Sequence, residues 1–374
     1  MTELSVLVAS HNAWAWTERA LAALDEHTEC SFEVVVVDNA STDGTLDCLP
    51  QRFPEARLVV NDTNEGFGPA TNRAAELARS PVVLLLNTDA VVGPGWYPPL
   101  AEQLDRPGVG AVVPALVNPN GSLQGAGALL GADGSVVSYG AGADVGDARF
   151  AFRRVVPFGP AACLLMRRAD FLAVGGLDPV YAPAYFEDVD LCFKLAERGL
   201  RTVYEPEVRV LHGGFASSGP GRALELYERH RPVFVKRWGP ALAPFPPTLF
   251  PSNPRRELAA RDATAEGRVL FLVPELGAPD DAVRELVRRR PWARLSVLAA
   301  AADAAFAPWW ELGVEVFVEP GVATILEERS MHYDVVVSPV EYAPLVARHQ
   351  QCATVLTPPA SADAIEAELR RLGI

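Results

Sequence analysis

Two apolar runs that end in polar and acidic side chains constrain the fold of this chain more than any other feature. Residues 34–37 are four valines followed by Asp38, and residues 82–86 are an apolar run followed by Asn87 and, two residues later, Asp89. Runs of this length predict buried strands, and ligands of open α/β sheets bind where the parallel strands end. We therefore expect these polar side chains to face one crevice, although each Asp could equally cap its own loop.

A pair of adjacent acids, Glu187 and Asp188, follows an aromatic loop and begins a predicted helix. The free N–H groups and the dipole at a helix N-terminus stabilise a carboxylate anion. We therefore expect Asp188 to be ionised at neutral pH and able to accept a proton from a bound hydroxyl. Acids at a helix start often serve only as caps, so the pair by itself does not establish a catalytic role.

A single histidine, His212, comes after an apolar run and before Gly213 and Gly214. A histidine in such a place is more often a loop residue with satisfied hydrogen bonds than a ligand. The acidic motif before it and the flexible glycines after it make the two roles equally compatible with the sequence.

Five short motifs lie in a characteristic order along the first 240 residues or so. They are the run from Leu4 to Asn12, the turn from Val37 to Thr45, the segment from Asn64 to Arg73, the segment from Leu86 to Ala90, and the acidic motif from Glu187 to Asp190 with His212 after it. In this order and spacing they resemble the family 2 glycosyltransferases, and among these the rhamnosyltransferase-type branch. Each motif is weak by itself, but the set is specific.

The resemblance implies a GT-A fold, a mixed α/β sheet flanked by helices, with a nucleotide-diphosphate sugar across the carboxyl edge of the sheet. It implies that Asp38 accepts a hydrogen bond from the base, and that the donor site also includes Ser10, Gly66, Asn72 and Asn87.

The same resemblance implies that Asp89 holds a divalent cation, Mn²⁺ or Mg²⁺, with His212 completing the coordination. Carboxylate and phosphate oxygens suit both ions, and an imidazole is better tolerated by Mn²⁺. Asp188 would be the catalytic base, with Glu187 as the neighbouring candidate. The sequence departs from the usual pattern at Asn87, where many relatives have a first Asp of an Asp-x-Asp metal motif, and this departure weakens the expectation of tight metal binding.

The chain is predicted to form two domains joined by a Pro-rich linker. Residues 1–240 would be the GT-A domain, residues 241–265 the linker, and residues 266–374 a smaller doubly wound, Rossmann-like α/β domain built from five apolar runs that alternate with helical stretches. The smaller domain has neither a Walker loop nor a Gly-x-Gly-x-x-Gly turn, so we assign it no chemistry; it could bind the acceptor, a partner or its own copy. Within the first domain, residues 118–151 predict a mobile or acceptor-facing excursion.

Charge and hydropathy exclude several classes of partner. A net charge of −14 argues against nucleic acid as a partner and against general binding to anionic lipid. No apolar run approaches the roughly 18 residues of a membrane-spanning helix, and the N-terminus enters a predicted strand without a signal peptide. We expect a cytoplasmic protein. An amphipathic helix predicted over residues 222–238 packs on its own domain or on a partner, or touches the inner face of the membrane.

These observations together predict an inverting, metal-assisted glycosyltransferase of cell-surface polysaccharide synthesis. It would transfer a sugar, with rhamnose as one candidate, from a UDP- or dTDP-linked donor to a hydroxyl of a glycan or lipid-linked glycan. A glycoside hydrolase is disfavoured because adjacent acids at a helix start cannot easily flank a glycosidic bond. A catalytically silent nucleotide-sugar-binding protein that works through its C-terminal domain is the remaining alternative, with Asn87 as its best support.

Overall fold

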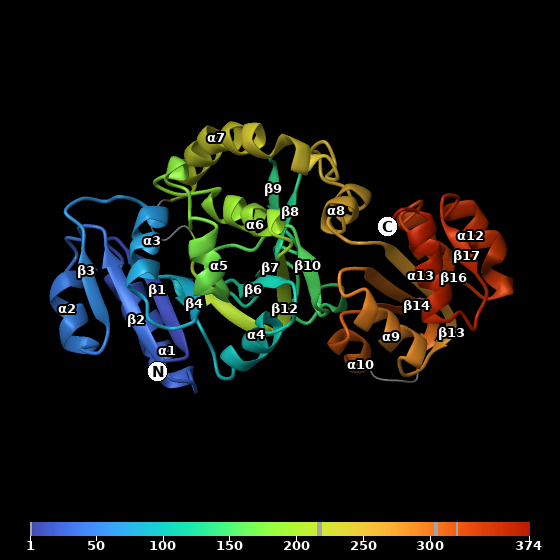
Figure 1. The fold of residues 1–374 in the computed structure, drawn as a ribbon, viewed down its shortest axis with the longest axis horizontal. Coiled ribbons are helices and arrows are strands. Elements are labelled where there is room, and N and C mark those ends of the chain that lie inside the picture. The colour runs from blue at the N-terminus through green and yellow to red at the C-terminus, as the bar shows by residue number, and fades with distance from the viewer. Residues whose placement is uncertain (1, 215–218, 303–305, 319–320) are drawn as a thin grey trace. The chain divides into compact units, whose positions relative to one another are not determined.

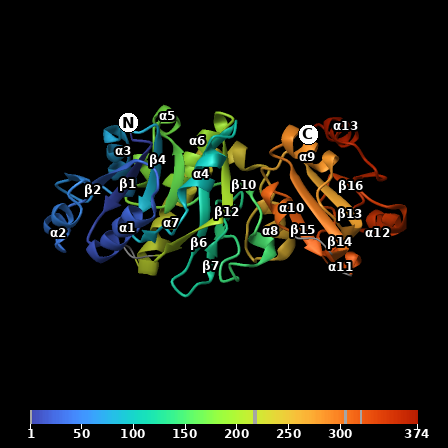
Figure 2. The same ribbon diagram turned by 90° about the horizontal axis from the view of Figure 1, so that it is seen from below.

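The computed structural model describes residues 2–214, 219–302, 306–318 and 321–374. Two compact units make up the chain (Figures 1 and 2). The first unit consists of residues 1–145 and 156–243, and the second of residues 146–155 and 244–374. In the described part of the chain, no helix is long and apolar enough to cross a membrane.

A mixed sheet forms the centre of the first unit. Its strands follow the order β12-β6-β11-β4-β1-β2-β3. Their bounds are β1 (Leu4–Ser10), β2 (Phe32–Asp38), β3 (Arg57–Val60), β4 (Val82–Asn87), β6 (Val109–Val117), β11 (Cys163–Arg167) and β12 (Arg201–His212). Strand β1 pairs in parallel with β2 and β4, whereas β11 runs antiparallel to β4 and β6. The strands predicted over residues 34–38 and 82–86 are therefore neighbours of one central strand.

Helices and short strands complete the first unit. The helices are α1 (Trp14–His27), α2 (Thr45–Arg52), α3 (Phe67–Leu77), α4 (Tyr97–Leu104), α5 (Arg168–Ala173), η2 (Pro179–Tyr181), α6 (Glu187–Glu197), α7 (Gly219–Trp238) and η3 (Gly239–Leu242). The predicted excursion contains the short strands β7 (Leu123–Gly125), β8 (Ala128–Leu130) and β9 (Val136–Ser138), of which β7 pairs with β6 and β8 with β9. Helix α7 packs against α6, because Phe193 contacts the rings of Phe234 and Trp238 (Figure 1).

Five parallel strands form the sheet of the second unit, in the order β15-β14-β13-β16-β17. They are β13 (Arg268–Leu276), β14 (Arg294–Ala302), β15 (Glu315–Val318), β16 (Val335–Val337) and β17 (Thr354–Leu356). Alternate residues of β13 belong to two different apolar clusters, Val269 and Phe271 to one, Leu270 and Leu272 to the other. Because successive side chains of a strand point to opposite faces, both faces of this sheet are covered, and the predicted doubly wound architecture is confirmed.

The helices of the second unit are α8 (Pro254–Arg261), α9 (Asp281–Arg289), α10 (Ala307–Glu311), α11 (Val322–Glu328), η4 (Val340–Tyr342), α12 (Ala343–His349) and α13 (Ala362–Arg371). The segment 146–155 also belongs to this unit; it contains η1 (Ala148–Phe150) and begins β10 (Arg154–Val156). The fully buried ring of Phe152 lies 5.8 Å from the guanidinium of Arg261 and 5.3 Å from that of Arg294. Sequence analysis assigned segment 146–155 to the first domain. The domain bounds, taken as folding units, stay a prediction.

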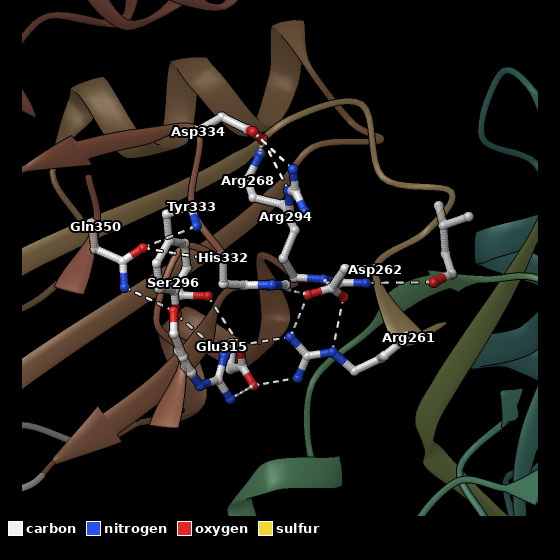
Figure 3. Close-up of polar contacts among 12 residues, drawn as sticks. Arg261, Asp262, Arg268, Arg294, Ser296, Glu315, His332, Tyr333, Asp334 and Gln350 are labelled. Carbon is white, nitrogen blue, oxygen red and sulfur yellow. Dashed lines mark hydrogen bonds and ion pairs between the residues drawn. The ribbon is translucent and has the colours of Figure 1, made fainter. Parts of the chain in front are cut away.

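A buried ion cluster lies at the amino ends of β14 and β15 in the second unit (Figure 3). Asp262 accepts hydrogen bonds from Arg261 at 2.7 and 2.8 Å, from Arg294 at 2.9 Å, and contacts His332 at 2.9 Å. Glu315 is bound by Arg261 and by both terminal nitrogens of Arg329, the latter at 2.9 Å. We use the term buried ion cluster for these residues: Arg261, Asp262, Arg294, Glu315, Arg329 and His332.

Candidate active site

Ser10, Asp38 and Asn87 end three adjacent parallel strands of the first unit. Ser10 is in register with Asp38 across β1 and β2, and Ala9 is in register with Asn87 across β1 and β4. The structure therefore places the three residues side by side on one edge of the sheet, where ligands of open α/β sheets bind. The hydroxyl oxygen of Ser10 is buried and has no hydrogen-bond partner within the described residues, so a donor or acceptor on a ligand would satisfy it.

Asp38 is fully buried and closes its own turn. One carboxylate oxygen accepts a hydrogen bond from the backbone N–H of Ser41 at 2.7 Å, and the other accepts one from the Ser41 hydroxyl at 2.6 Å. This is the loop-capping role that the sequence left open. Each carboxylate oxygen can accept a second hydrogen bond, so recognition of a nucleotide base by Asp38 stays a prediction.

Gly66 and Asn72 support the segment that leads to the acid pair. Gly66 has φ = +94°, and a Cβ at this position would lie 2.7 Å from the Cα of Pro183. Only glycine tolerates both the left-handed backbone and this close approach. The Asn72 amide donates to the carbonyl oxygen of Leu177 at 2.7 Å and accepts from its N–H at 2.8 Å. Direct contact of either residue with a nucleotide stays a prediction.

Asp89 and His212 meet because of a strand pairing that the sequence did not reveal. Strand β5 (Ala90–Val91) pairs antiparallel with the end of β12, so that Ala90 is opposite His212. The Nε2 atom of His212 lies 3.2 Å from Oδ1 of Asp89 and 3.4 Å from Nδ2 of Asn87. Burial raises the pKa of Asp89, but the hydrogen bond and charge that His212 supplies when both ring nitrogens are protonated, together with backbone N–H groups, outweigh burial and hold the pKa below its usual value. The carboxylate is therefore anionic at neutral pH.

The sequence analysis did not identify Gln124, which contacts His212. Oε1 of Gln124, in β7, lies 2.7 Å from Nδ1 of His212. Gln124 belongs to the Gly-rich excursion and is 88 positions from His212, and no periodic pattern or motif singles it out. Only the pairing of β7 with β6 brings it to the site.

The acid pair begins α6, as the sequence predicts, and the turn before it has an unusual backbone. Tyr185 and Phe186 have φ values of +75° and +76°, which non-glycine residues rarely adopt. The turn is held from α7: Nδ1 of the buried His230 lies 3.0 and 3.1 Å from the carbonyl oxygens of Ala184 and Tyr185. Strained turns of this kind persist where the surroundings over-determine them, and they cluster at functional sites. The sequence analysis did not identify His230.

Glu187 is buried and Asp188 is half-buried, and the pKa values of both rise. Burial, followed by the negative charge of Asp188, raises the pKa of Glu187 well above its usual value. Burial also raises the pKa of Asp188, although the backbone N–H groups of Val189 at 2.8 Å and Ala161 at 3.3 Å oppose the rise. The helix N-terminus was expected to dominate at Asp188. Instead, burial outweighs it.

Two alanines link the acid pair to the strand ends. Ala161 donates its N–H to Oδ2 of Asp188 at 3.3 Å, and the carbonyl oxygen of Ala162 accepts from the N–H of Asn87 at 3.0 Å. Asp188 and Asn87 are therefore held by consecutive residues of one backbone segment. The described residues contain no group of three or more His, Cys, Asp or Glu side chains that could hold a metal ion by themselves.

The chain is similar in sequence to known glycosyltransferases. The family described as glycosyl transferase family 2 matches residues 5–171. The chain is 32% identical over 258 residues to the N-acetylglucosaminyl-diphospho-decaprenol L-rhamnosyltransferase of Mycobacterium tuberculosis, covering 62% of this chain and 83% of that protein. It is also 32% identical over 251 residues to the O-antigen biosynthesis protein RfbC of Myxococcus xanthus, covering 62% of this chain and 18% of that one.

A solved structure shares the fold of the first unit. The crystal structure of GalNAc-T7 with UDP, GalNAc and Mn²⁺ superposes with a TM-score of 0.51 at 18% identity, covering 64% of this chain and 50% of that one. At this identity the likeness concerns the fold alone. Because the similarity to the mycobacterial enzyme extends over most of that enzyme, this chain belongs to glycosyltransferase family 2, in its rhamnosyltransferase-like branch, and is a glycosyltransferase of the GT-A fold.

Proposed function

We propose that this glycosyltransferase transfers a sugar from a nucleotide-diphosphate donor to a hydroxyl of a glycan or lipid-linked glycan, with inversion at the sugar carbon. The observation that supports this most is that consecutive residues, Ala161 and Ala162, hydrogen-bond to Asp188 of the acid pair and to Asn87. Asn87 in turn lies 3.4 Å from His212 of the Asp–His pair. The mycobacterial relative is named as an N-acetylglucosaminyl-diphospho-decaprenol L-rhamnosyltransferase, which favours a rhamnosyl donor and a lipid-diphosphate acceptor for this chain too.

Asp188 is the base in this proposal. It sits half-buried at the start of α6, and its raised pKa makes it a stronger proton acceptor than an exposed Asp. In this proposal Glu187 holds the proton of the pair, because burial and the charge of Asp188 raise its pKa well above the usual value, and its buried Oε2 has no hydrogen-bond partner among the described residues. Asp188 then removes the proton of the acceptor hydroxyl as its oxygen bonds to the sugar carbon and the bond to the nucleotide diphosphate breaks.

The residues around Asp89 fit a divalent cation that arrives with the donor. Oδ1 of Asp89 and Nε2 of His212, 3.2 Å apart, supply one oxygen and one nitrogen ligand. Two protein ligands are too few for a closed site, but Mn²⁺ and Mg²⁺ commonly complete their coordination with substrate phosphates and water. When bound, the cation would neutralise charge on the departing diphosphate. The neutral Asn87 lies beside Asp89 and adds no negative charge to the site.

The donor and the cation can be tested in one experiment. Thermal unfolding would be followed with UDP, dTDP and GDP, each with and without Mn²⁺, because a ligand that binds only the folded state raises the melting temperature. We expect UDP or dTDP to stabilise the protein, more so with Mn²⁺, and Asp89→Ala to remove the Mn²⁺ contribution. Transfer of rhamnose from dTDP-rhamnose to a polyprenyl-diphospho-N-acetylglucosamine acceptor is then assayed with and without chelator. Full transfer in excess chelator would disprove the cation's role, and an absence of any nucleotide effect would disprove the donor assignment.

The catalytically silent alternative is not favoured. A binding module would have no use for an acid pair with raised pKa values next to a strained turn, since both destabilise the fold. The family membership established above points the same way.

A further inference from the structure

We propose that Gln124 determines which ring nitrogen of His212 carries the proton, and so directs the lone pair of Nε2 towards Asp89. The proposal rests on the cation role of Asp89 and His212 given above, and it makes Gln124 a positioning residue. Gln124 contacts His212 twice: Oε1 lies 2.7 Å from Nδ1, and Nε2 lies 3.2 Å from the carbonyl oxygen of the same histidine. The amide thus holds both the ring and the backbone at the end of β12.

The orientation of the Gln124 amide follows from its other neighbour. Its Nε2 atom lies 3.1 Å from Oδ1 of Asn118, which follows β6. Asn118 in turn directs its Nδ2 towards the hydroxyl of Ser122 at 3.0 Å and the carbonyl oxygen of Leu123 at 3.4 Å. A carbonyl oxygen can only accept, so the side-chain nitrogen of Asn118 must face Leu123 and its oxygen must face Gln124.

The reverse orientation of Gln124 would place Oε1 against two acceptors, Oδ1 of Asn118 and the carbonyl oxygen of His212. The side-chain oxygen of Gln124 therefore faces Nδ1 of His212, and Nδ1 must be the donor. A chain of hydrogen bonds that starts at a backbone carbonyl in β7 fixes the protonation of the ring.

The consequence appears at the other nitrogen. In a neutral imidazole with the proton on Nδ1, Nε2 carries only a lone pair. This lone pair lies 3.2 Å from the anionic Oδ1 of Asp89, and the two acceptors repel each other unless a second ring proton or a metal cation lies between them. Partners that fix the tautomer of a metal-binding histidine typically change metal affinity 10–100-fold. Gln124 therefore prepares His212 as a ligand before the donor arrives.

The experiment reads the tautomer directly in the metal-free protein. The ¹⁵N chemical shifts of the histidine ring are measured at alkaline pH, where the ring carries one proton, and His212→Gln identifies the signals. We expect Nδ1–H in the wild type and a shift towards Nε2–H in Gln124→Met, since Nε2–H can then donate to Asp89. Gln103→Met is the matched control, because Gln103 is a buried glutamine of α4, in the same unit. It should leave the His212 signals unchanged.

Binding of Mn²⁺ in the presence of the stabilising nucleoside diphosphate provides the second measurement, by electron paramagnetic resonance. We expect roughly 10–100-fold weaker binding in Gln124→Met and wild-type binding in Gln103→Met. An Nε2–H ring in the wild type, or an unchanged ring in Gln124→Met, would overturn the role of Gln124. If the wild type binds no Mn²⁺ while its ring is Nδ1–H and shifts in Gln124→Met, the cation role fails, whereas Gln124 still fixes the ring.

Discussion

The acids Glu187 and Asp188 in the first unit and Asp262 and Glu315 in the second are all buried except Asp188, which is half-buried. The pKa values of the two groups nevertheless move in opposite directions. Burial acts on all four. At Asp262 and Glu315 the adjacent arginines outweigh burial, and both pKa values fall far below their usual range. At the pair that begins α6, backbone N–H groups oppose burial but do not outweigh it, and both pKa values rise.

The two groups of acids differ in the side chains that pair with them. Arg261 alone binds both acids of the buried ion cluster, and Figure 3 shows it between Asp262 and Glu315. Fully paired charges of this kind fix a structure but leave no proton acceptor available. In the acid pair of the first unit, a buried oxygen of Glu187 has no hydrogen-bond partner within the part of the chain that the structure describes. A site that must take up a proton near neutral pH needs the second arrangement, and it gives up stability for it.

The largest expected effect tests whether Asp188 is the working acid. Asp188→Asn keeps the shape and deletes the proton acceptor, so kcat should fall about 10²–10⁴-fold, or roughly 3–5.5 kcal/mol of barrier. Nucleoside-diphosphate affinity, measured by calorimetry, should remain near normal. Glu187→Gln is the comparison, and as a mimic of the protonated state it should retain most activity. A nearly active Asp188→Asn beside an inactive Glu187→Gln would transfer the role to Glu187.

The same kind of substitution in the second unit should act on stability. Asp262→Asn leaves the buried Arg261 and Arg294 without their shared carboxylate, and breaking a buried pair in this way costs about 3–5 kcal/mol. Urea unfolding should show this loss, with sugar transfer in the folded protein little changed. Glu187→Gln, by contrast, should be neutral or stabilising. Equal losses of unfolding free energy in Asp262→Asn and Glu187→Gln would mean that the two acid groups do not differ as proposed.

Stability should depend on pH with opposite sign at the two groups. Folded-state pKa values below the unfolded ones mean that Asp262 and Glu315 stabilise the protein above about pH 4 and lose this contribution as the pH falls. The destabilisation by Asp262→Asn should therefore shrink in acid. Because the pKa values of Glu187 and Asp188 are higher in the folded than in the unfolded state, these two acids oppose folding increasingly as the pH rises above about 4. The advantage of Glu187→Gln in melting temperature should grow with pH, and a constant difference would contradict the raised pKa.

A smaller effect separates nucleotide recognition from turn closure at Asp38. Asp38→Ala should weaken nucleoside-diphosphate binding by about 1.5–3 kcal/mol, which is tenfold or more, if Asp38 accepts a hydrogen bond from the base. Because Asp38 also accepts two hydrogen bonds from Ser41, Ser41→Ala is the control for the turn. Calorimetry should show a much larger loss for Asp38→Ala. Equal losses of affinity in the two variants would show that Asp38 only closes its turn.

The smallest perturbation is a cut between the two proposed domains. Within the predicted linker Phe245 and Leu249 are buried, whereas Phe250 is 58% exposed, so proteases should cut between residues 250 and 254 rather than throughout. Mass spectrometry should show two protected fragments. The isolated C-terminal fragment should melt below the intact chain, because Phe152 of segment 146–155 is then missing from its place beside Arg261 and Arg294. Unfolding of residues 1–240 after the cut would show that the proposed boundary is misplaced.

The parts of the site that the sequence could predict are those set by local periodicity. A buried strand ends where its apolar run ends, so Asp38 and Asn87 could be placed at strand tips from their own neighbours. The start of α6 at Glu187 follows likewise from a local signal. The comparisons confirm the fold and the glycosyltransferase activity inferred from the order of these motifs.

Residues recruited from a distance could not be predicted. Gln124 reaches His212 across 88 positions and His230 reaches Tyr185 across 45, and neither lies in a pattern that marks it. Helix α6 also shows the limit of a local argument. Its N-terminus was expected to favour the Asp188 anion, but the burial that raises the pKa comes from the packing of other segments around it.

The sequence by itself determined the two sheets, the strand ends that carry Asp38 and Asn87, and the helix that begins with the acid pair, because strand and helix periods are properties of neighbouring residues. Only the tertiary structure decided the direction in which the pKa of each acid moves. Electrostatic environment depends on atoms within a few ångströms in space, and at Asp262, Asp89 and Glu187 those atoms include side chains or packing from distant parts of the chain.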